Sequence, residues 1–464
     1  MSVLSGFQDY QLASLFKLSK LEHLKTSDCR LSVRCKKILE TIRKNPNRSF
    51  PQVIQNRNQL KLLYRFFSND NINHQEILEA TYQDTLSKLD LLDSDEMILV
   101  AQDTSEFDFT NRPNTNLGYL HKKKHNGFLS HSGLAITSSG LPVGLLFQKN
   151  WIRNRDEFGK KHDRARKPLK EKESYRWLEC LEHLDKLNNT LIKNSHKPKH
   201  FLVVGDRESD ILEVLKYQSE TNIDILVRCR HDRLLDSSKK YKNKHIGKLF
   251  ELLKDQEVKG TLELEIGHSG QLPERNIILN LKWSSIFIDK QIFWVVEASN
   301  KDEDVSWRLI TTIQITNQEE AKQIVYFYHL RWLIERFHYV LKSGCQIEDL
   351  QLEEEQSLFK ALTIYNIIAS DILLVTYFAR LLPDLSCLIF FTELEWKTIY
   401  TYVNHHRPKH NEPTPNIQEV TKWLGVMGGY IPNKKHPPGV KAIWTGLTVL
   451  KELVRYELIL QKGR

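Results

Sequence analysis

Two apolar runs that each end in an aspartate constrain the fold of this chain more than any other feature of its sequence. MILVAQDTS (97–105) delivers Asp103 near its end, and FLVVGD (201–206) ends at Asp206. Helical patterns separate these runs from each other and from a third, NIDILVRCR (222–230). Strands that alternate with helices indicate an α/β sheet, and such sheets place active sites at the carboxyl ends of buried strands. We therefore expect an α/β protein whose active site lies where the strands deliver these acids.

The sequence pattern changes at about residue 231. From there to about residue 300, GTLELEIG, NIILNLKW and QIFWVVEA alternate or run apolar, with glycine and charged turns between them. A period of two indicates strands, so a β-rich insertion of about 70 residues is predicted. WRLITTIQI (307–315) returns to the main sheet, and Asn317 is expected to cap a long helix that continues to about Ser343.

Positive charge gathers at the amino-terminal end of the chain. The formal net charge is +9, and residues 1–70 hold 13 Lys and Arg against 5 Asp and Glu. One basic helix is predicted within LSVRCKKILETIRKNP (31–46), and a second from about Asn58 to Phe67. Two short basic helices can neutralise phosphates and reach into a groove of DNA. An ordinary helical domain with a solvated basic face has the same composition, so charge alone leaves both interpretations open.

Several protein classes do not fit the composition. No pair among the six cysteines has CxxC spacing, which argues against a zinc ribbon and against a secreted disulfide framework. The first ten residues lack a basic stretch leading into an apolar one, so no secretory signal is expected. The most apolar stretch, 362–382, contains several polar residues and favours a buried helix over a membrane span. We expect a soluble protein of a reducing compartment.

The predicted long helix carries four chemically active side chains on one face. At about 100° per residue, an arc of roughly 60° holds Tyr328, Arg331, Glu335 and Lys342. Such a stripe is commonly a ladder of surface ion pairs. Two strand-end aspartates followed by a helical glutamate also suit a carboxylate cluster that holds two divalent cations, with Mg²⁺ or Mn²⁺ preferred by oxygen ligands. The order of the three acids favours the cluster.

The spacing Tyr328-x2-Arg331-x3-Glu335-x6-Lys342 resembles the Tyr-Arg-Glu-Lys signature of bacterial cut-and-paste DDE transposases of the insertion-sequence-four type. Further segments resemble the end of that family's DNA-binding domain, its two aspartate motifs, its Lys-Glu-Ser-x-x-Trp segment and its carboxyl-terminal region. These segments are LLYRFFSN (62–69), AQDTS (101–105), VVGDRESDI (203–211), KESYRW (172–177), WLGVMGGY (423–430) and PPGVKAIWTGLTVL (437–450). The resemblance therefore covers essentially the whole chain.

The resemblance implies an RNase H-like catalytic core, a mixed sheet flanked by helices, with a β-rich insertion. It also implies a helical amino-terminal DNA-binding domain and a helical carboxyl-terminal domain. The implied bounds are 1–75 for DNA binding, 76–230 and 306–350 for the core, 231–305 for the insertion and 351–464 for the dimerisation region. The expected location is the bacterial cytoplasm, with the protein on the nucleoid when it is bound to DNA.

The same resemblance implies roles for individual residues. Asp103, Asp206 and Glu335 would be catalytic and would hold two Mg²⁺ ions, for which Mn²⁺ could substitute. Arg331 and Lys342 would grip phosphates near the element's end, and Tyr328 would hydrogen-bond a phosphate of the same strand.

Four more residues are implied to contact DNA. Arg228 and Arg230 stand where the family places basic contacts to the end, although one of these is usually lysine. Trp307 stands where the family stacks an aromatic ring on a flipped base, and Trp332 could wedge nearby. Either tryptophan could instead fill the core.

The implied function is a transposase that binds the terminal inverted repeats of an insertion sequence. It would excise the element through a nick, a hairpin and hairpin opening, and then transfer its strands to target DNA. The expected partners are the transposon ends, target DNA and a second copy in a synaptic homodimer, with no membrane.

Three other classes stay open to comparison. A tyrosine recombinase would need an HxxR motif, which no histidine of the chain begins. A repair or junction nuclease of RNase H-like fold would share the acids but not the four-residue spacing. A catalytically weak or inhibitory DNA-binding copy that dimerises with an active transposase is the remaining alternative.

Four acids beside the two aspartates match no motif position and are expected to be solvated or to support the site from outside. These are Glu106, Asp108, Glu208 and Asp210. His338 could approach the metal site, though a packing or DNA contact is favoured. The pair His405-His406 is expected to lie on the surface, because no second pair with ligand spacing accompanies it.

Overall fold

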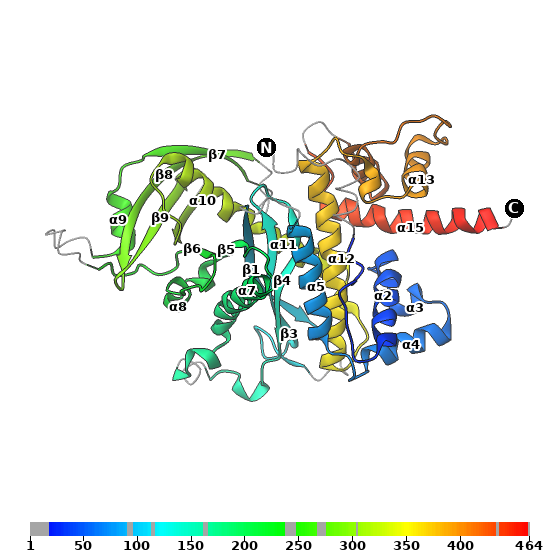
Figure 1. The fold of residues 1–464 in the computed structure, drawn as a ribbon, viewed down its shortest axis with the longest axis horizontal. Coiled ribbons are helices and arrows are strands. Elements are labelled where there is room, and N and C mark those ends of the chain that lie inside the picture. The colour runs from blue at the N-terminus through cyan, green and yellow to red at the C-terminus, as the bar shows by residue number, and fades with distance from the viewer. Residues whose placement is uncertain are drawn as a thin grey trace. The chain divides into compact units, whose positions relative to one another are not determined.

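The computed structural model describes residues 18–90, 96–112, 117–160, 166–236, 247–266, 275–302, 305–432 and 436–462. The first ten residues, where no secretory signal is expected, lie outside this part of the chain. The chain forms two compact units (Figure 1). Unit 1 comprises Met1–Ser94, Thr104–Lys161 and Leu333–Arg464, and unit 2 comprises Asp95–Asp103 and His162–Trp332.

A mixed sheet forms the centre of unit 2. Its strands follow the order β1-β5-β6-β10-β9-β8-β7. The bounds are β1 Met97–Asp108, β5 His200–Gly205, β6 Ile223–Arg228, β7 Gly260–Ile266, β8 Arg275–Ile288, β9 Gln291–Asn300 and β10 Val305–Thr311. The first three strands in this order are parallel, and every later pairing is antiparallel. The predicted α/β class and the predicted strands are confirmed, whereas the RNase H-like fold and the domain bounds stay predictions.

Four helices accompany this sheet in the described part of unit 2. They are α7 Arg176–Lys193, α8 Leu212–Leu215, α9 Leu249–Asp255 and α10 Gln318–Leu330. Asn317 caps α10 as predicted, because its side-chain oxygen accepts the Glu320 N–H at 3.0 Å. Figure 1 shows α10 along the strands of the predicted insertion, where it packs on β7, β8 and β9.

Unit 1 contains antiparallel strands and a set of helices. Its strands are β2 Gly118–Tyr119, β3 Asn126–Thr137 and β4 Pro142–Trp151, and β1 contributes its residues from Thr104 onward. Its helices are α2 Cys29–Lys44, α3 Phe50–Val53, α4 Arg57–Phe67, α5 His74–Leu89, α11 Trp332–Tyr339, α12 Glu355–Leu381, α13 Glu393–Asn404, α14 Ile417–Met427 and α15 Val440–Lys462. The two basic helices predicted near the amino terminus are α2 and α4.

Helix α12 is the central helix of unit 1. It is long and apolar enough to cross a membrane by length and composition, yet its most apolar window is completely buried in the protein. It packs against α5, α4 and β4, whose apolar side chains replace water around it (Figure 1). This confirms the predicted buried helix.

Two glycines explain why α14 and α15 approach closely. A Cβ at Gly428 would lie 1.9 Å from the carbonyl oxygen of Ala442, and one at Gly446 would lie 2.0 Å from that of Leu424. Only glycine permits this backbone-to-backbone contact. Both glycines belong to the carboxyl-terminal segments that carried the family resemblance.

The predicted long helix from Asn317 to Ser343 is not continuous. It ends as α10 at Leu330, resumes as α11 at Trp332 and finishes in a π-helical turn, Val340–Gly344. The Arg331 N–H bonds the Tyr328 carbonyl, three residues back, and the Cys345 N–H bonds the Val340 carbonyl, five residues back. These bonds replace the regular α-helical spacing. The predicted placement of the four signature side chains on one face assumed 100° per residue throughout, so it does not hold across the break at Arg331 and the π-helical turn.

Candidate active site

Asp103 and Asp206 lie at the same edge of the unit 2 sheet. Strands β1 and β5 are parallel, with Ala101 beside Val204. Continuing this register by two residues brings Asp103 beside Asp206 on one face, on strands about 4.8 Å apart. The neighbouring parallel strand β6 ends at Arg228, one residue beyond the pair Gly205 and Val227. Two acids and an arginine thus stand at the carboxyl ends of three adjacent strands.

The turn after β5 holds the Asp206 carboxylate in place. Its Oδ1 accepts the Glu208 N–H at 2.8 Å, and the Ser209 hydroxyl donates to the Asp206 carbonyl at 2.7 Å. Gly205 makes room for this turn, because a Cβ there would lie 2.1 Å from the Ser209 oxygen. The turn is therefore fixed by its own side chains and backbone.

Arg176 anchors the same turn from the helix α7 side. Its guanidinium lies 2.8 Å from the Glu208 carboxylate and over the ring of Trp177 at 5.2 Å. Arg176 and Trp177 belong to the KESYRW segment. The structure thus joins this segment to the second aspartate motif, and Glu208 supports Asp206 from outside the site, which was one of the two expectations for it.

Asp210 is not a solvated acid, because its side chain is completely buried. Its carboxylate accepts the N–H groups of Arg230 at 2.6 Å and His231 at 2.8 Å, and it binds the Arg233 guanidinium at 2.5 Å. Asp210 therefore ties the turn after Asp206 to the segment after β6 that carries Arg228 and Arg230. The sequence pattern showed only an acid after a strand, since the partners of Asp210 stand 20 or more residues later.

Aromatic rings gather where β10 meets the end of α10. Trp307 packs edge-on against Tyr328 at 5.5 Å and roughly parallel to His329 at 6.4 Å, and Trp332 lies 6.4 Å from His329. The Arg331 guanidinium lies over the Tyr328 ring at 5.9 Å. The structure thus brings together four residues predicted to contact DNA. Desolvation in this cluster lowers the pKa of His329 to about 4.

His329 was missed by the sequence analysis, because a histidine on a helix has no distinctive spacing. Its sequence position beside the signature tyrosine was the one available signal. Arg228 joins the same region, since its guanidinium donates to the Ser306 carbonyl at 3.1 Å, next to Trp307. Arg230 is exposed at the sheet edge.

The four signature residues divide between the two units. Tyr328 and Arg331 belong to unit 2, whereas Glu335 and Lys342 belong to unit 1. Glu335 is exposed on α11, and the Lys342 ammonium lies 3.6 Å from the Glu348 carboxylate. The predicted single stripe is therefore not observed within either unit.

The chemistry of the Asp103–Asp206 pair suits a hard divalent cation. Both donors are carboxylate oxygens at the carboxyl ends of two parallel strands, and Asp206 is only partly buried. Within the described ranges, no group of three or more His, Cys, Asp or Glu side chains is arranged to hold a metal ion. The sheet thus supplies a fitting two-carboxylate donor set, and a third ligand from Glu335 stays a prediction.

The basic surface of α2 is smaller than its composition suggests. The Arg43 guanidinium lies 2.8 Å from the buried Asp371 carboxylate of α12 and also donates to the Ser19 carbonyl. Its charge is therefore neutralised inside unit 1. Lys37 and Lys44 stay exposed on α2, and Lys61 and Arg65 on α4.

Comparison with known families identifies two matching regions. Residues 16–72 match the transposase DNA-binding family, and residues 171–370 match the transposase DDE domain. The first region includes α2, α3 and α4. The second includes Asp206 and the four signature residues, Glu335 among them, and it begins after Asp103.

Among solved structures, a piggyBac transposase synaptic complex with hairpin DNA, determined by cryo-EM, is similar at 9% sequence identity. The match covers 97% of this chain and 82% of that chain, with a TM-score of 0.36. Similarity at this level does not establish a shared fold.

Proposed function

Because this chain is a DDE transposase, we propose that it moves an insertion sequence of the insertion-sequence-four type by a cut-and-paste mechanism. The DNA-binding domain makes DNA its partner, and DDE chemistry depends on a divalent metal ion. The observation that carries the proposal is the placement of Asp103 beside Asp206 at the carboxyl ends of β1 and β5, with Arg228 on the next strand.

We propose that Asp103, Asp206 and Glu335 hold two Mg²⁺ ions, for which Mn²⁺ substitutes. Such ions would lower the pKa of an attacking water or 3′-hydroxyl and stabilise the leaving oxygen of a phosphodiester. The protein's own contribution is rigidity: the Glu208 N–H and the Arg176–Glu208 ion pair orient the Asp206 carboxylate before any ligand arrives.

The aromatic cluster of unit 2 is proposed to receive the end of the element. Trp307 is partly exposed and is positioned by Tyr328 and His329, so its free surface could stack on a flipped base. Arg331 would bind phosphate through its guanidinium fork, with Tyr328 donating a hydrogen bond to the same strand. Trp332 would wedge nearby, and Arg228 and Arg230 would bind the backbone beside Asp206.

The helices of the matched DNA-binding region are proposed to recognise the terminal inverted repeats. Exposed lysines and arginines on α2 and α4 would neutralise phosphates, so end binding should weaken steeply as salt rises. Lys342 in unit 1 would grip a further phosphate. We also propose that two copies act together as a homodimer on the two ends, in the bacterial cytoplasm.

The proposed reaction consists of successive in-line displacements at phosphorus. Water first nicks the end and releases a 3′-hydroxyl, which attacks the opposite strand to form a hairpin. Water then opens the hairpin to leave a blunt excised end, and the 3′-ends finally attack target DNA. In each step the nucleophile displaces one oxygen, so a single site can serve all four.

The test is cleavage of a plasmid that carries the gene's own flanking DNA, with Mg²⁺ and the full-length protein. We expect double-strand release at the flanks, and Glu335→Gln should lower its rate at least about 10²- to 10³-fold. Glu319→Gln is the matched control, because Glu319 is a highly exposed acid paired with Lys322 on α10.

Each outcome of that assay decides between functions. Release that Glu335→Gln abolishes and Glu319→Gln preserves would support the cut-and-paste proposal. End binding without cleavage by the wild-type protein would favour an inhibitory copy that dimerises with an active transposase. If the wild-type protein neither binds nor cleaves the flanking DNA, the proposal that these flanks are its substrate is overturned.

A further inference from the structure

A strongly basic turn joins β2 to β3 in unit 1. Lys122, Lys123 and Lys124 are consecutive, and all three are exposed. Within the described part of the chain, no carboxylate pairs with any of them. Three adjacent positive charges therefore face solvent without internal compensation.

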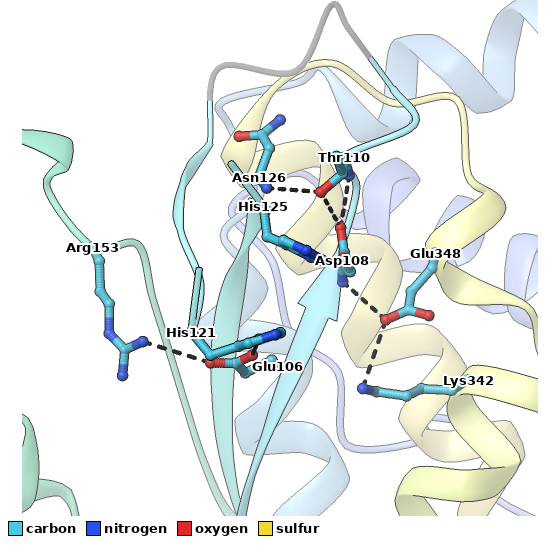
Figure 2. Close-up of polar contacts among 9 residues, drawn as sticks. All are labelled: Glu106, Asp108, Thr110, His121, His125, Asn126, Arg153, Lys342 and Glu348. Carbon is cyan, nitrogen blue, oxygen red and sulfur yellow. Dashed lines mark hydrogen bonds and ion pairs between the residues drawn. The ribbon is translucent and has the colours of Figure 1, made fainter. Parts of the chain in front are cut away.

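Two histidines fasten this turn to strand β1 at both sides of the lysines. His121 Nδ1 lies 2.7 Å from the Glu106 carboxylate, and His125 Nδ1 lies 2.6 Å from the Asp108 carboxylate (Figure 2). Glu106 and Asp108 stand two residues apart, so their side chains project from the same face of the strand. The two imidazole rings lie 4.9 Å apart. The turn is thus held at both ends rather than free to move as a flexible loop.

The two carboxylates have further partners beside the histidines. The Arg153 guanidinium lies 3.6 Å from Glu106, and the Thr110 N–H and hydroxyl both donate to Asp108 (Figure 2). Each acid is therefore occupied by partners from its own unit. Glu106 and Asp108 were expected to be solvated or to support the site from outside; both are partly exposed, and both also anchor this turn.

Aromatic contacts position two of the cations. The Lys123 ammonium lies 5.9 Å from the centre of the Phe158 ring, and the Arg153 guanidinium lies 5.7 Å from that of Tyr119. The Phe158 and Tyr119 rings pack edge-on at 5.0 Å. Such contacts reduce the side-chain freedom that a bound partner would otherwise have to remove.

Contacts within unit 1 connect the turn to Lys342. The Asp108 N–H donates to Glu348 Oε1 at 2.9 Å, and the Lys342 ammonium lies 3.6 Å from the same oxygen (Figure 2). The Lys342 ammonium also lies over the Phe107 ring at 5.4 Å. Strand β1 therefore carries Glu106 and Asp108, which anchor the turn, and Phe107, which contacts the proposed phosphate-binding Lys342.

We propose that Lys122, Lys123 and Lys124 form a second binding surface for the DNA backbone, in the same unit as Lys342 and linked to it through Asp108 and Glu348. This inference rests on the proposed function, since it assumes that Lys342 binds phosphate. A duplex held at Lys342 continues past the neighbouring residues of β1, and a fixed row of cations suits its regularly spaced phosphates. Contacts from lysine ammonium groups to phosphates do not depend on base sequence, so we expect the surface to add affinity and not sequence specificity.

The test is DNA binding by the full-length protein at a series of NaCl concentrations, without divalent metal. The probes are a duplex from the gene's flanking DNA and a scrambled duplex of equal length. The triple variant Lys122→Ala, Lys123→Ala, Lys124→Ala should weaken binding to both probes. Each lost phosphate contact flattens the plot of log affinity against log salt by about 0.9, so we expect a slope shallower by about 1.8 to 2.7.

The matched control is Lys186→Ala, Lys193→Ala, Lys254→Ala, which also removes three exposed lysines from unit 2 helices. The variant Lys122→Arg, Lys123→Arg, Lys124→Arg keeps the charges and should restore the wild-type slope. Thermal unfolding of each variant verifies folding. If the wild-type protein binds DNA but the Lys122, Lys123 and Lys124 alanine variant changes the slope no more than the control does, this inference is overturned and the proposed function is not. A wild-type protein that binds neither probe would overturn the proposed function instead.

Discussion

At the scale of single residues, His329 gives the structure a defined pH dependence. Its folded pKa is about 4 because burial among aromatic rings penalises the imidazolium, whereas its usual value is about 6.5. Above pH 6.5 the histidine is neutral in both states and has no effect. Below pH 6.5 the unfolded chain takes up the proton first, so unit 2 should lose about 1.4 kcal/mol of stability per pH unit down to about pH 4.

Thermal unfolding between pH 7.5 and pH 4.5 checks this prediction. His329→Phe keeps an aromatic ring against Trp307 and Trp332 but cannot titrate, so its melting temperature should fall less steeply than that of the wild type. His196→Phe, at an exposed position of the same unit, should behave like the wild type. Parallel pH profiles for His329→Phe and the wild type would contradict the prediction.

For single residues, the sequence predicted positions that an apolar run determines directly, such as an acid at the end of a buried strand. Asp206 was predicted at a sheet edge because FLVVGD ends there. Asp210 could not be predicted as a buried anchor, since its partners Arg230, His231 and Arg233 are brought to it by the return of the chain through β6. Long-range partners of this kind leave no local pattern.

At the scale of elements, Asp210 joins the turn after β5 to the chain after β6. In Asp210→Asn the partly buried Arg233 guanidinium loses its counter-charge, and the backbone N–H groups of Arg230 and His231 lose part of their acceptor. We expect unfolding by denaturant to show a loss of about 3–5 kcal/mol. Adding Arg233→Gln should recover part of this loss, because the unpaired charge is removed as well.

The same elements make a functional consequence measurable. Asp210 fixes the backbone at Arg230. The double variant should therefore bind end DNA less tightly than the wild type, even though part of its stability is recovered. Asp255→Asn, at the exposed end of α9, is the control and should change neither property. Full additivity of Asp210→Asn and Arg233→Gln in the free energy of unfolding would contradict the coupling.

The break in the predicted long helix shows the limit of periodicity at this scale. The residues from Gln318 to Gly344 include no proline and no glycine before Gly344, so their pattern carries no signal for a one-residue interruption. The interruption at Arg331 appears instead as a change in hydrogen-bond partners, which only the packed structure reveals. The strands, whose alternation reflects burial directly, were predicted more faithfully.

At the scale of the whole molecule, a bound metal ion should change the stability of the fold. The proposed ligands are Asp103, Asp206 and Glu335. A cation that binds all three is bound only by the folded chain, so it should raise the stability of the protein by mass action. At a free Mn²⁺ concentration of about 100 times the dissociation constant, the gain is about 2.7 kcal/mol.

Calorimetric Mn²⁺ binding and thermal unfolding, both without DNA, separate the contribution of each acid. Asp206→Asn should abolish most of the Mn²⁺-induced shift in melting temperature, because it removes half of the donor pair on the sheet. Glu335→Gln should reduce the shift and weaken Mn²⁺ binding, whereas Glu319→Gln should leave both unchanged. If Glu335→Gln behaves like the wild type while Asp206→Asn does not, the sheet pair binds the ion without Glu335, and the proposed third ligand is wrong. If neither variant changes Mn²⁺ binding, the ion binds elsewhere and the assignment of both acids fails.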